Sequence, residues 1–497
     1  MKFIAIVFDG LRPDQIDERV TPNLCALARA GLRLDQHTAS FPSETRVSSA
    51  AIATGSHGSG HGIVGNKFFT KGQFIDGASL PTLLSLGSET QGVLTSTAIG
   101  EVLRAHGRTM LSIGSQSQGS WGLSSWGSWQ SDAPAFWVHD PKKFSSNPIV
   151  HRIASTFPEL PKGEAPALDT IKRVVDVFFS YVACAPLPDL TLLWLSEPDI
   201  SYHLFGLAHP KAREVLSKVD GEFGRILNWW DAERSKQQLQ LIAASDHGHA
   251  IIGEKVSVSS YLAKAGFAVG AEFSDKSNVV LTAQRAVNIW VRDKDLGLLS
   301  ELHHCLSETP WFGVAFSRTM PDGLPLLETT LPHSAVFAEH ARSPDLSFVL
   351  GDCAQTNRDS SPDTVFYDGT YPVGVGMHGG LTRFELSSLC ILAGDHFGHG
   401  VLTTPTSIVD LAPTILNGLG LPLPQTVQGR VMEEASHAQP TERYSADDAS
   451  LSVTSSRRQA VLHRVRYRER LYLKGAEINW NAAEKRGSES RPPITAG

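Results

Sequence analysis

The sequence contains few cysteines, and they show no pairing pattern. Only five occur in 497 residues, and none belongs to a CxxC motif; they are Cys25, Cys184, Cys305, Cys353 and Cys390. An odd, scattered set is typical neither of a disulfide framework nor of a thiolate metal site. We therefore expect buried free thiols in a reducing compartment, and a cytoplasmic location.

Long apolar runs and an excess of one charge are also lacking. No run approaches the roughly 20 apolar residues that a transmembrane helix needs. The apolar start, MKFIAIVFDG, is too short for a signal sequence and ends at Asp9. A net charge of −7 is mild for this length and does not indicate a basic surface for binding nucleic acid or an anionic membrane. The sequence thus predicts neither a nucleic-acid nor a membrane partner.

The sequence instead has the composition and the alternation of an α/β protein. Hydrophobic residues make up 41% and charged residues 19%, as in ordinary globular proteins. Strands are predicted over 3–8, 190–195, 239–244 and 389–393, and helices over 21–31, 213–230 and 407–419. This order predicts a sheet covered by helices on both faces.

The middle and the end of the chain differ from this core. Residues 254–362 carry their own strand–helix–strand signals at 286–291, 296–307 and 313–317, which predicts a smaller α/β cap. The cap would be inserted between core segments 1–253 and 363–432. Residues 433–497 form a polar C-terminal extension in which VLHRVRYRERLYL predicts a strand or hairpin, before a frayed RGSESRPPITAG end.

Acidic and histidine side chains cluster where the predicted core strands end. Strand ends of this kind gather ligands at one edge of an α/β sheet. Three Asp and three His are what two closely spaced divalent ions need; they are Asp9, Asp199, His203, Asp246, His247 and His378. Singly, each also fits a turn, a helix cap or a surface position. His249, next to the fifth ligand, is a further but weaker candidate.

Thr45 lies at the start of a predicted helix over 45–54. A hydroxyl at a helix N-terminus lies among free N–H groups and at the positive end of the dipole. Coordination to a metal would lower its pKa further and make it a nucleophile. The alternative is simple N-capping by Ser43 or Thr45.

The ordered motifs IVFDG, FPSET, ATGSHGSGHGIVGN, SEPDISYH, SDHGH and MHGG resemble the alkaline phosphatase superfamily. Within it they are most similar to the type I phosphodiesterase/nucleotide pyrophosphatase family, with phosphonoacetate hydrolase as a near neighbour. The resemblance covers about residues 1–255 and 365–432, and implies an alkaline phosphatase-like core sheet.

The resemblance also implies ligand sets and roles. Zn²⁺ is the expected metal, with Mn²⁺ as the alternative. One ion would be held by Asp9, Thr45, Asp246 and His247, and the other by Asp199, His203 and His378. The Asn66 amide would donate to a nonbridging oxygen of the substrate. The alternative is that Asn66 is only a turn residue in its loop.

Two departures from the family pattern bear on the substrate. Where the family often has Pro-Asn after the nucleophile, this chain has Arg46 followed by Val47. Arg46 could pair with a substrate phosphate or carboxylate, or could face outward. Phosphonoacetate hydrolases hold their substrate with lysines, and the segment Gly114-Ser115-Gln116 offers none.

The sequence therefore predicts a two-metal hydrolase that cleaves phosphodiester or pyrophosphate bonds through a phospho-threonine intermediate. A phosphonate hydrolase and a phosphomonoesterase or phosphotransferase of the same superfamily are the alternatives, and a non-catalytic metal-binding protein is a remote one. The partner is a small phosphate- or phosphonate-containing substrate. A homodimer is one option for the assembly.

Overall fold

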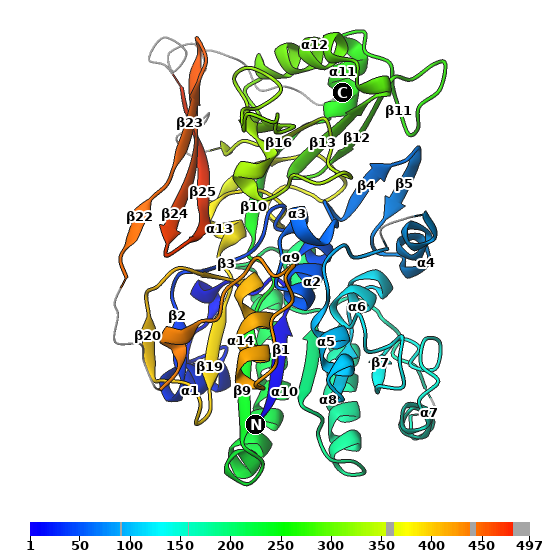
Figure 1. Cartoon of the computed structure of the whole chain (residues 1–497), viewed down its shortest axis with the longest axis vertical. Helices are drawn as coiled ribbons and strands as arrows, with labels where there is room; N and C mark the ends of the chain where they lie inside the picture. The colour runs from blue at the N-terminus through cyan, green and yellow to red at the C-terminus, as the bar shows by residue number, and fades with distance from the viewer. Residues whose placement is uncertain (90–91, 158, 354–361, 438–443, 481–497) are drawn as a thin grey trace.

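The structure is a computed structural model that describes residues 1–89, 92–157, 159–353, 362–437 and 444–480. Figure 1 shows two regions along the long axis. One holds a central sheet with its helices, and the other is formed by the middle and the end of the chain.

The central sheet has eight strands in the order β20–β2–β19–β9–β1–β8–β6–β7. They are β1 (Lys2–Phe8), β2 (Leu32–Leu34), β6 (Met110–Gly114), β7 (Ala135–Trp137), β8 (Leu190–Leu195), β9 (Leu239–Ala244), β19 (Cys390–Ala393) and β20 (Gly400–Leu402). β1 is parallel to both β8 and β9, and β19 joins β9 antiparallel. The four predicted core strands are confirmed, because strands buried on both faces are continuous apolar runs in the sequence.

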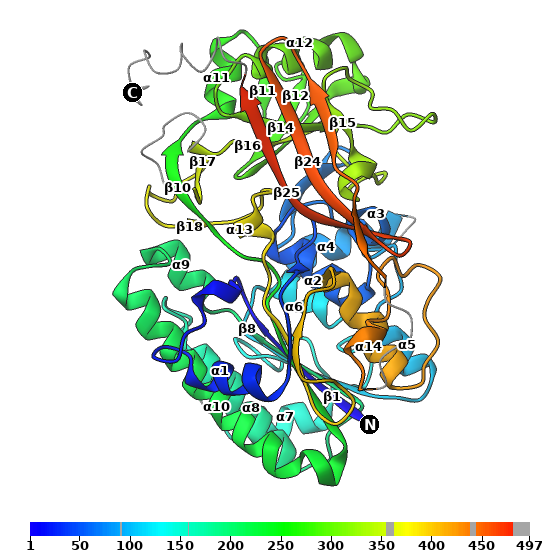
Figure 2. The ribbon, with the colours of Figure 1, turned by 90° about the vertical axis from the view of Figure 1, so that its left-hand side faces the viewer.

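Helices cover both faces of this sheet. On one face lie α1 (Pro22–Ala30), α7 (Pro148–Ser155), α8 (Leu168–Val182) and α10 (Pro210–Gln237), and on the other α2 (Thr45–Thr54), α5 (Ile99–Ala105) and α14 (Leu411–Gly418). Figure 2 shows α1, α8 and α10 on one side of the sheet and α5 and α14 on the other. The predicted α/β class with two covered faces is confirmed.

Strand β1 shows how the two layers share one strand. Ile4 and Phe8 pack under the α1, α8 and α10 layer, while Phe3 and Val7 pack under the α2, α5 and α14 layer. Each such side chain contributes about 1.5–3 kcal/mol when fully buried. The ends of β1 are therefore firmly placed, and so is the loop that follows it.

The middle of the chain forms a second sheet in the order β11–β12–β13–β16–β14–β15. Its elements are β11 (Val269–Gly270), β12 (Val279–Ala283), β13 (Ala286–Val291), β14 (Phe312–Ser317), β15 (Leu331–Pro332) and β16 (Leu346–Leu350), with helices α11 (Val258–Lys264) and α12 (Leu296–Ser307). All of them fall inside the segment predicted as the cap. The boundaries of the four predicted chain segments stay a prediction.

A small sheet connects the two regions. It consists of β10 (Ala250–Lys255), β17 (Thr364–Tyr367) and β18 (Gly376–Met377), with β10 in the middle. β10 leaves the end of the central sheet, and β18 returns the chain to it. The residue after β18 is His378, so this sheet brings the last predicted ligand back to the first ones.

The described residues 444–480 of the C-terminal segment belong to the packed structure. β22 (Ala446–Asp448), β23 (Leu451–Thr454), β24 (Arg458–Tyr467) and β25 (Arg470–Trp480) form an antiparallel sheet. Leu462 and Leu473 pack in a core cluster with Phe316 of β14. The predicted hairpin is confirmed, and the predicted frayed end lies outside the described residues.

The remaining short strands and α-helices complete the described structure. They are β3 (His37–Thr38), β4 (Lys67–Thr70), β5 (Gln73–Asp76), β21 (Thr406–Ser407), α3 (Gly58–His61), α4 (Leu80–Leu84), α6 (Gln118–Ser124), α9 (Asp199–Phe205) and α13 (Arg383–Leu386).

The cysteines correct one expectation. All five are free thiols, but only Cys353 and Cys390 are buried; Cys25 and Cys305 are partly exposed and Cys184 is exposed. The expectation of buried thiols is therefore wrong for three of them. Among the described residues, no helix combines the length and the apolar character that crossing a bilayer requires.

Candidate active site

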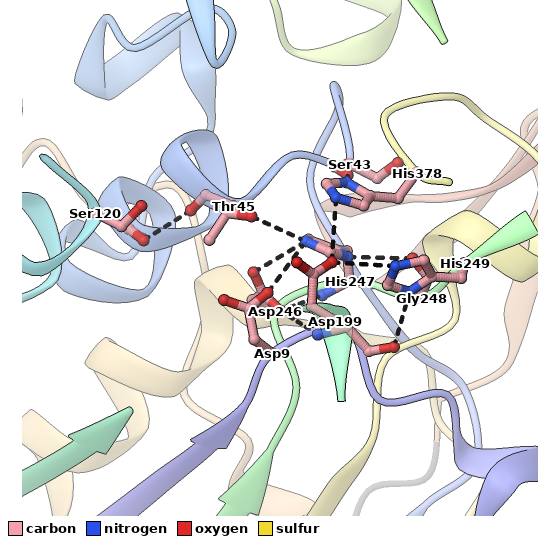
Figure 3. Close-up of polar contacts among 12 residues, drawn as sticks. Asp9, Ser43, Thr45, Ser120, Asp199, Asp246, His247, Gly248, His249 and His378 are labelled. Atoms are coloured by element: carbon pink, nitrogen blue, oxygen red, sulfur yellow. Dashed lines mark hydrogen bonds and ion pairs between the residues drawn. The ribbon is translucent and has the colours of Figure 1, made fainter. Parts of the chain in front are cut away.

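The predicted site residues meet at the edge of the central sheet where β1, β8 and β9 end together. Phe8 pairs with Leu195, and Val7 pairs with Ala244, so the three strands finish in register. Asp9 directly follows β1, and Asp246 follows β9 after one serine. Asp199 is the first residue of α9, after β8, and Figure 3 shows the three carboxylates facing the histidines.

The three predicted histidines share one hydrogen-bond pattern. Nδ1 of His203 lies 2.8 Å from the Gly376 carbonyl oxygen, and Nδ1 of His378 lies 2.8 Å from the Ser43 carbonyl oxygen. Nδ1 of His247 lies 3.1 Å from the carbonyl oxygen of the next residue. A carbonyl can only accept, so each neutral ring carries its proton on Nδ1. The Nε2 lone pairs are then available to a metal.

These nitrogens and carboxylates form two groups of potential ligand atoms. In one, Nε2 of His203 and Nε2 of His378 lie 3.2 and 3.3 Å from Oδ1 of Asp199. In the other, Nε2 of His247 lies 3.2 Å from Oδ2 of Asp246 and 3.5 Å from Oδ1 of Asp9. The ligand atoms of each group lie within 4.8 Å of one another. The division is the one that the family resemblance implies.

Hydrogen bonds hold the carboxylates but leave selected oxygens without a partner. Oδ2 of Asp9 accepts from Nε1 of Trp194 at 2.9 Å, and Oδ1 of Asp246 accepts from the Gly10 N–H at 3.0 Å. The remaining oxygens, Oδ1 of Asp9, Oδ1 of Asp199 and Oδ2 of Asp246, are buried with no hydrogen-bond partner. An orphaned buried acceptor is costly, and these are the oxygens that face the Nε2 atoms. The set therefore fits bound divalent cations.

The electrostatics of these side chains support the same conclusion. Burial raises the pKa of Asp9 well above its usual range, and repulsion from Asp246 and Asp199 adds to this. Burial also raises the pKa of Asp246 to about 7. Burial also opposes ionisation of Asp199. The contacts of its carboxylate with His203, His249 and His378 outweigh burial and hold the pKa of Asp199 well below its usual range. Cations at this site would remove the repulsion between the carboxylates.

Thr45 lies on the border of the Asp9 group. It is the first residue of α2, and its Oγ1 lies 3.2 Å from Nε2 of His247. The capping alternative is wrong: the N-cap position belongs to Glu44, which makes no side-chain cap, and the Ser43 hydroxyl donates to the Gly380 carbonyl oxygen. The Thr45 hydroxyl is thus available at the positive end of the helix dipole.

Asn66 and Arg46 lie beside the start of α2. Oδ1 of Asn66 accepts from the Arg46 N–H at 3.1 Å, which fixes the amide orientation and leaves its NH₂ group as the donor. Nη2 of Arg46 donates to Oγ of Ser117 at 3.2 Å. The structure therefore brings both predicted substrate-binding residues next to Thr45.

Three further residues lie at the site: His249 was the weaker candidate from the sequence, and Glu44 and Tyr371 were not selected from it. His249 joins the Asp199 group; its place two residues after His247 was the only signal for it. Glu44 is buried, and its carboxylate accepts from the Asn66 N–H. The Tyr371 ring stacks on the His203 ring with centroids 4.7 Å apart and planes 1° apart. Tyr371 lies in a loop, where the sequence has no periodicity to indicate it.

The sheet, its two helical layers and the paired Asp/His groups define an alkaline phosphatase-like α/β protein. The chain belongs to the type I phosphodiesterase/nucleotide pyrophosphatase family, whose sequence profile matches residues 3–380. The near relation to phosphonoacetate hydrolase stays a prediction.

Individual relatives are distant. Human (Homo sapiens) ectonucleotide pyrophosphatase/phosphodiesterase family member 7 is 24% identical over 259 residues, which is 51% of this chain and 49% of that protein. Human family member 5 is 23% identical over 269 residues, which is 53% of this chain and 48% of that protein. The chain spans about half the length of the curated relatives it matches.

Solved structures match over more of the chain. Murine ectonucleotide pyrophosphatase/phosphodiesterase 5, as an inactive threonine-to-alanine variant in complex with AMP, superposes with a TM-score of 0.57 at 17% identity. The match covers 85% of this chain and 96% of that one. The similarity at this level shows the shared fold.

Proposed function

We propose that this chain is a metal-dependent hydrolase of phosphodiester or pyrophosphate bonds, with Thr45 as its nucleophile. Family membership supports the class of reaction. The observation that carries the proposal is the position of the Thr45 hydroxyl, which lies 3.2 Å from Nε2 of His247. His247 belongs to the Asp9 group, whose carboxylates have buried oxygens without a hydrogen-bond partner.

Two divalent ions are proposed, one for each group of ligands. Zn²⁺ suits a set of imidazoles and carboxylates best, and Mn²⁺ is the alternative. When bound, such ions act as Lewis acids that lower the pKa of a hydroxyl and offset charge on phosphoryl oxygens. The Asp9 group would hold the ion next to Thr45, and the Asp199 group would hold the other.

Thr45, Asn66 and helix α2 have separate roles in the proposed reaction. Oγ1 of Thr45 forms a bond to phosphorus as the bond to the leaving oxygen breaks, which gives a phospho-threonine ester. Water cleaves this ester and restores the hydroxyl. The Asn66 amide donates to a nonbridging oxygen, and the positive end of the α2 dipole stabilises the charge that develops there.

Nucleotide-type substrates are the first class to test. The related murine protein binds AMP, and its threonine-to-alanine variant is inactive. Both facts support a threonine nucleophile and a phosphoryl group attached to a nucleoside. A phosphonate hydrolase and a monoesterase or phosphotransferase remain the alternatives, and an acceptor alcohol in the assay would reveal transfer. A homodimer and a cytoplasmic location stay predictions.

The test compares Thr45→Ala with Thr45→Ser on an aryl phosphodiester and on a dinucleotide pyrophosphate. We expect Thr45→Ala to lower kcat/KM by at least about 10³-fold, because the first displacement loses its nucleophile. Thr45→Ser keeps a hydroxyl and should retain measurable turnover. Metal content by elemental analysis should stay near two ions per chain in both. Full activity in Thr45→Ala would overturn the threonine mechanism, and active protein without metal would overturn the two-metal site.

A further inference from the structure

His249 lies fully buried beside the Asp199 group, in the SDHGH segment after β9. Its ring fits between two glycines that come from distant parts of the chain. A Cβ on Gly10 would lie 2.3 Å from Cε1 of the ring, and a Cβ on Gly376 would lie 3.0 Å from Cδ2. Gly10 also has φ +71°, which disfavours any other residue there. The backbone thus leaves space for this ring and fixes its direction.

The hydrogen bond of His249 determines which of its nitrogens carries the proton. Nδ1 lies 3.0 Å from the Gly10 carbonyl oxygen, which can only accept. The neutral ring therefore has its proton on Nδ1 and a lone pair on Nε2. That lone pair points at Oδ1 of Asp199 at 3.1 Å, and Nε2 has no hydrogen-bond partner.

Oδ1 of Asp199 faces three such nitrogens at once. Nε2 of His203, His249 and His378 lie 3.2, 3.1 and 3.3 Å from it. A proton on one of these rings would satisfy one contact and leave two lone pairs against a carboxylate oxygen. A cation among the four atoms satisfies all of them together. His249 is equivalent to the two predicted histidines in tautomer, distance and direction.

We propose that His249 is a protein ligand of the ion at Asp199, so that this ion has one carboxylate and three imidazole ligands. The inference rests on the proposed metal site and adds a ligand to it. Four protein ligands would satisfy the coordination that Zn²⁺ prefers and would admit a substrate oxygen as a fifth ligand in the transition state, whereas the Asp9 group offers three and leaves room toward Thr45. The ion at Asp199 is therefore the more tightly held of the two.

The ligand sets also differ in charge. One carboxylate at Asp199 leaves a divalent ion with a net positive charge, because imidazoles are neutral ligands. The carboxylates of Asp9 and Asp246 neutralise the other ion. The positive charge thus lies on the side away from Thr45, where it would attract the leaving oxygen of the substrate.

The decisive measurement counts metal-bound imidazoles in the full-length protein loaded with Co²⁺. A coordinated imidazole that keeps its Nδ1–H gives one exchangeable, hyperfine-shifted proton resonance, which appears in H₂O and vanishes in D₂O. We expect four resonances, from His203, His247, His249 and His378. His249→Ala should remove one. His333→Gln is the matched control, since His333 is equally buried but bonds Ser347, and it should keep all four.

A competition assay with a Zn²⁺ chelator gives a second readout. Outer-shell substitutions typically weaken metal binding by roughly 10–100-fold. We expect His249→Ala to weaken the tighter site by at least the upper end of that range and to leave the weaker site unchanged. Wild-type protein that binds two Co²⁺ ions but shows three exchangeable resonances would overturn the role of His249 alone. Protein that binds no Co²⁺ would overturn the proposed metal site as well.

Discussion

The ion pair between Arg285 and Glu385 joins the cap to the segment that carries His378, and its removal should be costly. Nε and Nη2 of Arg285 donate to the Glu385 carboxylate at 2.8 and 3.1 Å. Nη1 donates to the Leu350 and Phe366 carbonyl oxygens, both at 2.7 Å. Both side chains are almost completely buried, with 1% and 0% exposure. Arg285→Met removes all four bonds while keeping much of the side-chain volume.

The expected loss in the free energy of unfolding comes from the unpaired Glu385 carboxylate that remains after the substitution. Glu385 would stay buried as a charge without its partner, which costs about 3–5 kcal/mol. In the double variant Arg285→Met/Glu385→Gln no charge is stranded, and the amide oxygen of the introduced glutamine would still provide an acceptor for the Gly380 N–H, which Glu385 now bonds at 2.8 Å. We expect the double variant to recover at least about 2 kcal/mol of the free energy of unfolding.

The pH dependence of the free energy of unfolding tests the same argument. Burial raises the pKa of Glu385, but Arg285 outweighs burial and holds that pKa below its usual range. Without Arg285 the folded-state pKa rises above the unfolded value, so the folded state binds a proton more readily. The deficit of Arg285→Met relative to wild type should therefore shrink as the pH falls from 7 to 5.

Urea unfolding at both pH values measures these differences. Lys218→Met serves as a control, because Lys218 pairs with Glu214 in an exposed position, and its midpoint should match that of the wild type. Equal losses in the single and double Arg285 variants would refute the argument, since the stranded charge would then have no cost. A deficit that grows toward pH 5 would refute it as well.

Two further predictions concern substrate charge and acid stability. An aryl phosphodiester should have a higher kcat/KM than the matching monoester. A monoester carries one more negative charge, and Arg46 is the only cation that the motifs place beside Thr45. If the monoester is the better substrate and its advantage disappears in Arg46→Ala, a phosphatase assignment replaces the diesterase assignment. Burial lowers the pKa of His37 to about 3, so its unfolded form binds a proton below pH 6.5 while its folded form does not. Between pH 6.5 and 5 the free energy of unfolding should fall by about 1.6 kcal/mol more in wild type than in His37→Gln, because the slope approaches about 1.4 kcal/mol per pH unit only when the unfolded ring is fully protonated. Urea unfolding measures the difference, and parallel slopes would show that His37 is not buried as a neutral ring.

The sequence alone was sufficient for four of the eight central strands and for selecting most of the candidate ligand side chains that meet at one edge of the sheet. β8, β9 and β13 occupy the predicted ranges, as do α2 and α12. Buried parallel strands are continuous apolar runs, and small residues with a glycine end mark the α2 helix, so these signals are local. Asp9, Asp199 and Asp246 come soon after the ends of β1, β8 and β9, so these three could be found in the same way.

Element ends and exposed surfaces were less well determined. Helix α10 runs over Pro210–Gln237, well beyond the predicted 213–230, because its polar turns continue a helix that packs on the sheet. The long hairpin of β24 and β25 is polar on one face and buries Leu462 and Leu473 on the other. Its composition predicted a polar extension, whereas contact with β14 makes it part of the core.

His249 shows most clearly what only the tertiary structure decided. The sequence placed it near a metal site but could not orient its ring, because residues after a strand end have no fixed periodicity. Its direction depends on the Gly10 carbonyl oxygen and on the space left by Gly10 and Gly376, which lie far apart in the chain. The sequence determined which side chains could bind metal, and long-range packing determined which nitrogen atoms face the same oxygen.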